Sequence, residues 1–285
     1  MPELPEVETI RRDLERVLLG KEILGVQVRT PRLVRTDPGE LVAVLVGKYI
    51  NRITRRGKLL QFHIAGEDRV MHVHLKMTGQ LMCQVPGGLI AGGHPSAKID
   101  HLPNAYTHVV FEFDEETTLF FNDLRTFGYV ALLTPAAHEQ ALAAFGPEPL
   151  DEHFTRAHFF DALKGKRAIK AVLLDQTVIA GIGNIYADEI CFRARVRPSR
   201  RTDTLAAQEK ARLYNAMRTI IKKAVEKRGT TFSNFVDATG KKGGYMPYLM
   251  VYGRKGERCL RCGSQTITKS VVAGRGTHTC PLCQK

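Results

Sequence analysis

The spacing of apolar residues changes along the chain, and this change constrains the fold more than any other feature. Residues 3–19 repeat apolar side chains every three or four positions and end at Gly20, which predicts an amphipathic helix. Short β-like runs separated by turn residues follow. The predicted strands are 23–28, 41–53, 59–64, 69–75, 108–113, 118–121 and 129–133. A helix followed by many short strands predicts a β-sandwich with a flanking helix.

The pattern becomes helical after about residue 151. One predicted helix covers about 155–174. The longest covers about 203–228, with Asp203 or Thr204 as its N-cap and Gly229 after its end. One face of this helix is apolar and the other is basic. We therefore expect a helical domain in the second half of the chain.

A glycine-rich turn precedes another helix in this half. Gly181 and Gly183 permit sharp backbone turns, and a new helix is expected to begin near Asn184. The exposed amides at that helix start would suit a phosphate. A lone Gly-x-Gly is weak support by itself, and neither further glycines nor a βαβ pattern favours a nucleotide-binding fold.

Gly- and Pro-rich stretches interrupt both halves. Residues 85–104 are expected to form a long surface loop, and 135–151, which contain Gly-Pro-Glu-Pro, to link two domains. The fold class is thus an α+β multidomain chain. The predicted division is a β-sandwich domain at 1–134, the linker at 135–151, a helical domain at 152–250 and a C-terminal module at 251–285.

The charge of the chain indicates a polyanionic partner. Its 285 residues include 42 Lys and Arg against 29 Asp and Glu, a net charge of +13. Nucleic acid is the leading candidate, although a solubilising surface charge gives the same total. No apolar run approaches the ~18 residues of a membrane span, and no secretory signal is recognisable. A cytoplasmic protein with reduced thiols and no membrane partner is expected.

Four of the six cysteines form two Cys-x2-Cys pairs, Cys259 with Cys262 and Cys280 with Cys283, separated by seventeen residues. In a reducing compartment this spacing predicts one tetrahedral zinc site, because each pair makes a tight knuckle that aims two thiolates at one ion. Four cysteine ligands leave no open position for water, so the predicted zinc is structural. Two disulfides or an iron centre are the alternatives.

The chain begins Met-Pro-Glu-Leu-Pro-Glu-Val-Glu. A small second residue favours removal of Met1, which leaves Pro2 with a free secondary amine. An α-amino group has a pKa of about 7.7–8.0, so an appreciable fraction is neutral and nucleophilic near pH 7. Attack on a sugar anomeric carbon would give an iminium, and the adjacent Glu3 would move the protons. A proline near an N-terminus is ordinary in itself, so this hypothesis depends on the rest of the chain.

These eight residues resemble the N-terminus of the formamidopyrimidine-DNA glycosylases, which are bacterial base-excision repair enzymes. Outside 85–104 the resemblance covers nearly the whole chain. GIGNIYADE resembles the turn of the family's helix-two-turn-helix, and Gly-Thr-Thr and VYGRKG flank its lesion-covering loop. The other matching motifs are HLKMTG at 74–79, DLRTFG at 123–128 and RGTHTCPLC at 275–283. The resemblance implies an N-terminal β-sandwich, a helix-two-turn-helix domain and a zinc-finger β-hairpin.

The resemblance also implies a catalytic set. Pro2 would attack C1′ of the damaged nucleotide and displace the base, while Glu3 would protonate and deprotonate sugar oxygen and carbon centres. Lys58 and Arg275 would assist elimination of the 3′ and then the 5′ phosphate, which leaves a one-nucleotide gap. Glu6 matches a glutamate that holds the geometry of the nucleophile. Without the resemblance, Lys58 would be interpreted as a solvated strand-edge lysine.

Excision requires that the base leave the duplex, which creates a void in the stack. Met77, Arg125 and Phe127 match the family's void-filling residues. A flexible thioether, a guanidinium and an aromatic ring suit this task. From the residues alone, positions in the core would be the simpler interpretation for Met77 and Phe127.

A further set of donors would clamp a bent DNA backbone. The residues that match phosphate-contacting positions are His74, Tyr106, Lys166, Asn184 and Arg275. Tyr106 stands where many members have a His, but its hydroxyl can still donate. Leu124 and Thr126 replace a Pro and a basic residue, and Lys76 replaces the usual Gly beside Met77.

We therefore predict a bifunctional DNA glycosylase and abasic-site lyase that removes 8-oxoguanine and formamidopyrimidines from damaged double-stranded DNA. One structural zinc is the expected cofactor, with no nucleotide cofactor, and a monomer is expected. One alternative is an endonuclease VIII-like glycosylase for oxidised pyrimidines, whose start usually has Gly where this chain has Leu4. The other is a non-catalytic zinc-finger DNA-binding protein, against which Pro2, Glu3 and Lys58 together argue.

Overall fold

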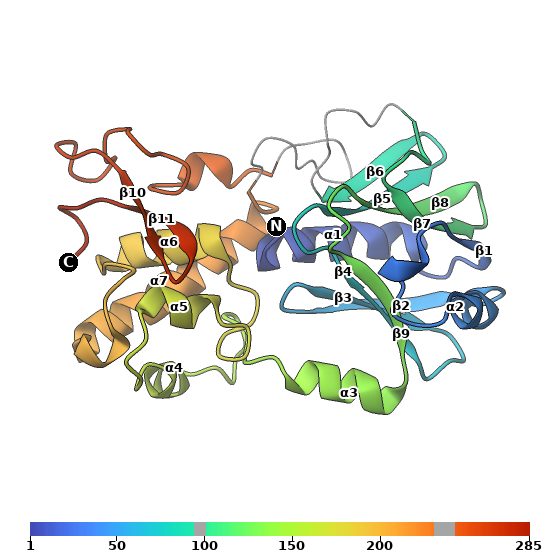
Figure 1. Cartoon of the computed structure of the whole chain (residues 1–285), viewed down its shortest axis with the longest axis horizontal. Coiled ribbons are helices and arrows are strands. Elements are labelled where there is room, and N and C mark those ends of the chain that lie inside the picture. The colour runs from blue at the N-terminus through green and yellow to red at the C-terminus, as the bar shows by residue number, and fades with distance from the viewer. Residues whose placement is uncertain (94–100, 231–242) are drawn as a thin grey trace. The chain divides into compact units, whose positions relative to one another are not determined.

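The computed structural model describes residues 1–93, 101–230 and 243–285, which form two compact units (Figure 1). The N-terminal unit consists of Met1–Ala143 and Lys227–Met246, and the C-terminal unit of Ala144–Glu226 and Pro247–Lys285. Within the described ranges, no helix combines the length and apolar character needed to cross a bilayer. The predicted α+β multidomain fold is confirmed.

Two antiparallel sheets and helix α1 (Leu4–Leu18) build the N-terminal unit (Figure 1). One sheet has the strand order β1-β7-β8-β5-β6 and the other β2-β3-β4-β9. Helix α1 contacts β2 and β3 of one sheet and β5 and β6 of the other. The strands are β1 (Ile23–Val28), β2 (Ile50–Arg56), β3 (Leu59–Ile64), β4 (Val70–His74), β5 (Gly79–Val85), β6 (Gly88–Gly93), β7 (Thr107–Phe113), β8 (Thr117–Asp123) and β9 (Tyr129–Leu133).

The apolar stripe of α1 supplies one side of the core. Val7, Ile10, Leu14 and Leu18 are buried in one cluster with side chains from both sheets, Phe62 among them. Glu3 is the N-cap residue of this helix, and Gly20 takes a φ of +76° just after its end. The flanking helix and the β-sandwich predicted from the sequence are thus both present.

The strand predicted at 41–53 is wrong in its first half. Helix α2 (Pro38–Leu45) occupies this stretch, and β2 begins only at Ile50. Asp37 is the N-cap of α2, and its side chain accepts the backbone N–H of Glu40 at 2.9 Å. Proline at the first helical position is pre-organised for this start. The Asp-Pro-Gly sequence that suggested a turn is therefore a helix start.

The loop expected at 85–104 begins as a strand. β6 pairs with β5 in a hairpin, so Gly- and Pro-rich composition did not exclude extended structure here. β5 itself was not predicted, although its first five residues are buried. The rest of the expected loop includes 94–100, which lie outside the described residues.

The C-terminal unit is mainly helical and carries a β-hairpin (Figure 1). Its helices are α4 (Arg156–Ala162), α5 (Ile169–Leu174), α6 (Asn184–Ala194) and α7 (Ala207–Glu226), and the hairpin strands are β10 (Thr268–Val272) and β11 (Arg275–Thr279). The start of α6 at Asn184 matches the prediction.

Two helix boundaries in this unit differ from the prediction. The helix expected at 155–174 is two helices, since α4 ends before Gly165 and α5 begins at Ile169. The helix expected from Asp203 begins at Ala207, and Thr202–Thr204 forms a 3₁₀ turn. The Glu209 carboxylate accepts the backbone N–H of Ala206 at 2.9 Å, which caps α7 later than predicted.

Residues after α7 group with the N-terminal unit. Arg228 Nη2 lies 2.6 Å and 2.8 Å from the two carboxylate oxygens of Asp13 on α1. Thr230 donates its backbone N–H to Glu6 Oε1 at 2.7 Å. The expected lesion-covering loop falls on 231–242, outside the described residues. Helix α3 (Pro135–Ala143) occupies part of the stretch predicted as a linker.

Three histidines lie close together on the face of the β2-β3-β4-β9 sheet that is opposite the core. His72 Nε2 lies 2.8 Å from His138 Nδ1 of α3. The ring centroids of His63 and His138 are 6.2 Å apart. Burial, reinforced by neighbouring charge, lowers the pKa of His63 to about 4 and that of His72 to about 4. The cluster is therefore neutral at neutral pH.

We expect this cluster to make the N-terminal unit acid-labile. An unfolded histidine has a pKa of about 6.5, so below that pH the unfolded chain takes up protons that the folded cluster resists. The stabilisation is complete above about pH 6.5 and is lost as the pH falls toward 4. Melting temperatures measured between pH 7 and 5 should decline in the wild type and decline less in a His63→Gln/His72→Gln variant. Equal declines would contradict this assignment.

Candidate functional site

The predicted nucleophile lies at the buried start of α1. Pro2 and Glu3 are both buried, and Glu3 is only 3% exposed. Glu6 Oε2 accepts the backbone N–H of Glu3 at 2.9 Å, while its other oxygen accepts the N–H of Thr230. Gly229 has a φ of +80°, and a Cβ there would come within 2.7 Å of the Glu6 carboxylate. One carboxylate thus fixes two backbone segments beside Pro2.

Glu3, Glu6 and Lys58, which are predicted to act with Pro2, lie close enough to the chain terminus to change its pKa. Burial lowers the pKa of the Met1 ammonium, Glu3 and Glu6 oppose this shift, and Lys58 adds to it. Lys58 is 5% exposed, so it is not the solvated strand-edge lysine of the alternative interpretation. An amine at this place is shifted toward its neutral, nucleophilic form.

An ion-pair cluster fixes the turn that carries Lys58. Arg55 Nε lies 3.1 Å from Glu8 Oε2 on α1, and its Nη1 donates to the Gly57 carbonyl at 2.9 Å. Although burial opposes it, hydrogen bonding and charge from Arg11 and Arg55 lower the pKa of Glu8 to about 2. Glu8 and Arg55 were not singled out from the sequence, because no local pattern reveals a contact across 47 positions.

Met77 projects from a tight turn between β4 and β5. Gly79 donates its backbone N–H to the Leu75 carbonyl at 2.8 Å, and a Cβ on Gly79 would overlap that same residue. Lys76 takes a φ of +48°, a conformation that its usual Gly counterpart adopts without cost. Met77 is 38% exposed and belongs to the surface rather than the core.

Arg125 and Phe127 lie in a second loop, which Asp123 organises. Its Oδ2 accepts the N–H of Phe127 at 2.8 Å and of Gly128 at 2.7 Å, and its Oδ1 accepts the N–H of Arg125 at 3.1 Å. The Thr78 hydroxyl donates to the same carboxylate. Asp123 therefore joins this loop to the turn of Met77. An Asp that begins a short loop is a recognisable turn signal, but its partner Thr78 is not evident from the sequence.

The two loops present their predicted void-filling residues to solvent. Phe127 is 52% exposed, so the structure excludes the core interpretation for this ring as it does for Met77. The Arg125 guanidinium carbon lies 4.6 Å from the Phe127 ring centroid, within cation–π range. A planar cation and an aromatic ring are thus held together on one exposed loop.

Two further predicted phosphate contacts lie in the N-terminal unit. His74 is the last residue of β4 and is partly buried. Tyr106 is 37% exposed just before β7, so this residue belongs to the surface. The neighbouring His108 is 5% exposed, and its Nε2 lies 2.8 Å from the Asp123 carbonyl. His108 therefore supports the Asp123 loop rather than replacing the expected histidine at 106.

The C-terminal unit carries the remaining predicted contacts. Lys166 is exposed between α4 and α5, and Arg275 is exposed at the start of β11. Asn184 donates its side-chain amide to the Gly276 carbonyl at 3.0 Å, which joins the start of α6 to the hairpin. One of its two amide hydrogens is thus used within the protein, next to Arg275.

A buried ion pair holds the β10–β11 hairpin in place. Lys170 and Asp188 are both 0% exposed, with Nζ and Oδ1 2.6 Å apart. Lys170 also donates to the Gly276 carbonyl at 2.9 Å and to the Thr277 hydroxyl at 2.8 Å. The backbone N–H of His278 donates to Asp188 Oδ2 at 2.8 Å. Lys170 and Asp188, which sequence reasoning missed, thus hold the three residues that follow Arg275, namely Gly276, Thr277 and His278.

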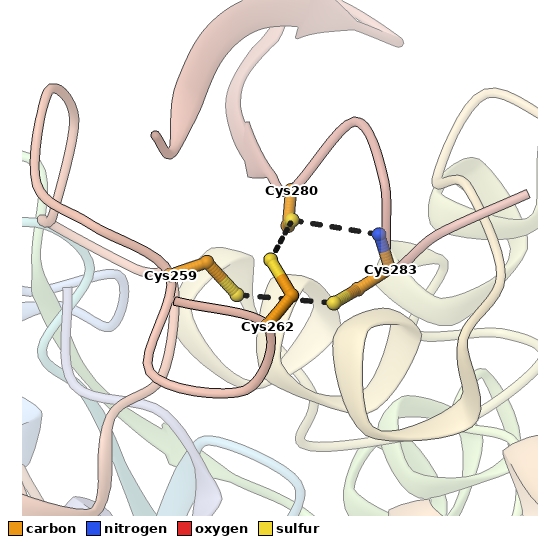
Figure 2. Close-up of side chains that lie close together, drawn as sticks. All are labelled: Cys259, Cys262, Cys280 and Cys283. Carbon is orange, nitrogen blue, oxygen red and sulfur yellow. Dashed lines mark hydrogen bonds between the residues drawn. The ribbon is translucent and has the colours of Figure 1, made fainter. Parts of the chain in front are cut away.

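The four predicted zinc ligands converge beside this hairpin (Figure 2). Cys259 Sγ lies 3.9 Å from Cys283 Sγ, and Cys262 Sγ lies 3.8 Å from Cys280 Sγ. Tetrahedral bonds of about 2.3 Å place sulfur atoms roughly 3.8 Å apart, so this set fits one zinc ion. All four cysteines are free, which excludes the disulfide alternative.

Three family profiles match the chain. They are the formamidopyrimidine-DNA glycosylase N-terminal domain over residues 1–130, the formamidopyrimidine-DNA glycosylase H2TH domain over 145–236, and the zinc finger found in FPG and IleRS over 256–285.

Full-length relatives and solved structures agree with these profiles. The formamidopyrimidine-DNA glycosylase of Pelotomaculum thermopropionicum is 42% identical and covers 100% of this chain and 99% of its own length. That of Geobacillus kaustophilus is 41% identical with 100% of both chains covered. The Lactococcus lactis FPG bound to N7-benzyl-Fapy-dG DNA has a TM-score of 0.87, 36% identity and full coverage of both chains. The same protein bound to abasic-site DNA gives a TM-score of 0.88 at 36% identity, with 99% of each chain covered.

Proposed function

Since the chain belongs to the formamidopyrimidine-DNA glycosylase family, we propose that Pro2 is its nucleophile and Glu3 its proton-transfer group. Family membership makes the chain a bifunctional DNA glycosylase and abasic-site lyase of base-excision repair, acting on oxidised purines in damaged DNA. The observation that carries the proposal is the burial of Pro2 at the start of the chain, with Glu3, Glu6 and Lys58 close enough to affect the terminal amine.

The proposed reaction begins after Met1 is removed. The Pro2 nitrogen attacks C1′, the bond from C1′ to the base breaks, and the base takes up the proton that the amine loses. The sugar ring opens as Glu3 protonates its oxygen. The resulting iminium acidifies the C2′ hydrogen, which Glu3 removes. The electron pair from that C–H bond expels the 3′ phosphate, and loss of the C4′ hydrogen then expels the 5′ phosphate. Water hydrolyses the remaining iminium and frees Pro2. Lys58 and Arg275 stabilise the departing phosphates by charge.

Borohydride trapping tests this mechanism directly. Reduction of the iminium should link the protein covalently to DNA that contains 8-oxoguanine, and peptide mapping should place the adduct on Pro2. An adduct on another residue would contradict the proposed nucleophile. Absence of any excision would instead contradict the activity.

We propose that the two exposed loops replace the extruded base. Met77, Arg125 and Phe127 fill the void, and the guanidinium can also bond the orphaned base. The phosphate contacts come from His74, Tyr106, Lys166, Asn184 and Arg275. Glu6 holds the backbone beside the nucleophile through its two hydrogen bonds.

Changing Phe127 to Ala should lower excision by roughly tenfold to 100-fold while leaving folding nearly unchanged. A stacking side chain is worth roughly 1–3 kcal/mol per base, whereas a buried aromatic truncated to Ala costs about 3–5 kcal/mol of stability. Single-turnover excision of 8-oxoguanine and urea unfolding measure the two quantities. Phe121, which is 0% exposed, provides the matched control, because Phe121→Ala should destabilise the fold strongly. A large loss of stability in Phe127→Ala would show that this ring has a structural role.

The four cysteines hold one structural zinc that supports the hairpin of Arg275.

We propose that the functional division follows the predicted boundaries, with chemistry in 1–134, DNA binding in 152–250 and the zinc finger in 251–285. We further propose that the enzyme acts as a monomer, without a nucleotide cofactor, on chromosomal DNA in the cytoplasm. Sedimentation of the free protein and of its DNA complex tests the monomer.

A second candidate activity is the excision of oxidised pyrimidines. The Lactococcus lactis FPG, 36% identical to this chain, has been crystallised with DNA that contains an oxidised pyrimidine. Excision rates measured side by side on 8-oxoguanine, formamidopyrimidine and an oxidised pyrimidine would rank the substrates. A pyrimidine rate above both purine rates would favour the endonuclease VIII-like alternative.

A further inference from the structure

Three side chains stack on the face of the β2-β3-β4-β9 sheet that is opposite the core. His74 ends β4 and lies directly opposite Tyr129, the first residue of β9. Their rings are nearly parallel, at 27°, with centroids 5.8 Å apart. The Arg35 guanidinium carbon lies 3.5 Å from the Tyr129 ring centroid, and the Arg35 backbone N–H donates to the Val130 carbonyl at 2.8 Å. Tyr129 thus contacts both the His74 ring and the Arg35 guanidinium.

The hydrogen bonding of His74 selects one tautomer. Its Nδ1 accepts the backbone N–H of Lys76 at 3.0 Å, so the ring proton of neutral His74 is on Nε2. In the described part of the chain, the structure gives Nε2 no hydrogen-bond partner. This N–H is therefore a donor available to a ligand.

The charges around His74 favour its neutral form. Burial lowers its pKa to about 3, and Lys76, Lys58 and Arg35 add to the shift. Lys76 belongs to the turn that follows β4, Lys58 precedes β3, and Tyr129 is the titratable neighbour on β9. A proton on Nδ1 would also displace the Lys76 N–H and disturb the turn that carries Met77.

We propose that Tyr129 and Arg35 are positioning residues that hold His74 as a neutral imidazole and aim its Nε2–H at a DNA phosphate. The contact between His74 and a DNA phosphate rests on the proposed function, whereas the stack of the three side chains does not. Arg35 is joined to β9 through Val130, so the stack fixes the ring from the sheet side. The hydrogen bond from the Lys76 N–H to His74 Nδ1 selects the tautomer and also holds the turn of Met77. The phosphate contact and the turn that carries Met77 therefore depend on the same hydrogen bond.

Titration of the free protein tests the stack without DNA. In ¹⁵N-histidine NMR spectra, wild-type His74 should remain neutral, with its proton on Nε2, from pH 7.5 down to pH 5. Tyr129→Ala exposes the His74 ring to water and should bring the pKa of His74 toward the ordinary value of about 6.5. Tyr129→Phe keeps the aromatic ring and should behave as the wild type does. If His74 stays neutral in Tyr129→Ala, with a melting temperature like that of the wild type, the proposal is overturned.

DNA affinity tests the phosphate contact. The probe is duplex DNA with a tetrahydrofuran abasic analogue, with Kd measured at pH 5.5 and 7.5. Because a charged donor bonds phosphate more strongly, Tyr129→Ala should gain roughly fivefold more affinity on acidification than Tyr129→Phe does. Adding His74→Gln to Tyr129→Ala should remove that gain. A gain that survives His74→Gln overturns the phosphate assignment. Failure of the proposed function is distinguishable, because it would show as absent excision and trapping with the NMR result unchanged.

Discussion

One additional residue ahead of Pro2 is expected to abolish both base excision and strand cleavage. The addition turns the Pro2 amine into an amide, whose nitrogen has no available lone pair for attack on C1′. Loss of a covalent nucleophile costs on the order of 10⁶-fold in rate in a well-studied enzyme, and we expect a loss of that size here. Excision of 8-oxoguanine and borohydride trapping measure the effect.

The matched control is the same extended protein after a protease has removed the addition and freed Pro2. It should recover both activities, whereas the extended form should still bind abasic-analogue DNA. A lysine would need strong desolvation to compete as a nucleophile near pH 7. Lys58 is 5% exposed and close to the terminus, so it is the residue to examine for a competing adduct. Full activity in the extended form, or an adduct on Lys58, would refute the mechanism and leave only DNA binding.

Some short β-like runs bounded by turn residues could be predicted closely from the sequence. The ranges 23–28, 59–64 and 129–133 match β1, β3 and β9 residue for residue. Prediction failed where one local signal has two structural meanings. Asp37-Pro38-Gly39 is compatible with a turn. Leu41 and Leu45 are buried while Ala43 between them is exposed, which fits a helix, because a strand would place all three on one face.

The chemistry-bearing residues could be named from motifs, but their supports could not. Lys170 lies 107 positions from Thr277, and only the folded chain shows that it holds the hairpin next to Arg275. Asp123 lies 45 positions from Thr78, and this contact joins the loops of Met77 and Phe127. Such contacts depend on tertiary packing, which local periodicity does not encode. The exposure of Met77 and Phe127 likewise depends on loop geometry. Residue type alone would suggest burial, because both side chains are apolar.

Loss of the zinc ion is expected to remove most of the DNA affinity. The core beside the four cysteines is small and includes Phe192, Val251 and Ile267, so metal binding supplies much of the folding free energy of this module. Without zinc, the hairpin that carries Arg275 is no longer supported by a folded module. Loss of two charge-assisted hydrogen bonds corresponds to a decrease in affinity on the order of 100-fold. Cys280→Ser should show this decrease in Kd for abasic-analogue DNA, together with a loss of bound zinc by elemental analysis.

A cysteine outside the cluster separates the role of the metal from a general effect of removing a thiol. Cys83 is buried in the N-terminal unit and belongs to the core of the β-sandwich, so Cys83→Ala should retain zinc and DNA affinity. Chelation of the wild-type protein should reproduce Cys280→Ser, and added zinc should restore binding in the chelated protein only. Because all four ligands are cysteines, the metal has no open position for water and supports binding rather than chemistry. A zinc-free protein that binds DNA with unchanged affinity would show that the hairpin is held by the Lys170–Asp188 pair alone.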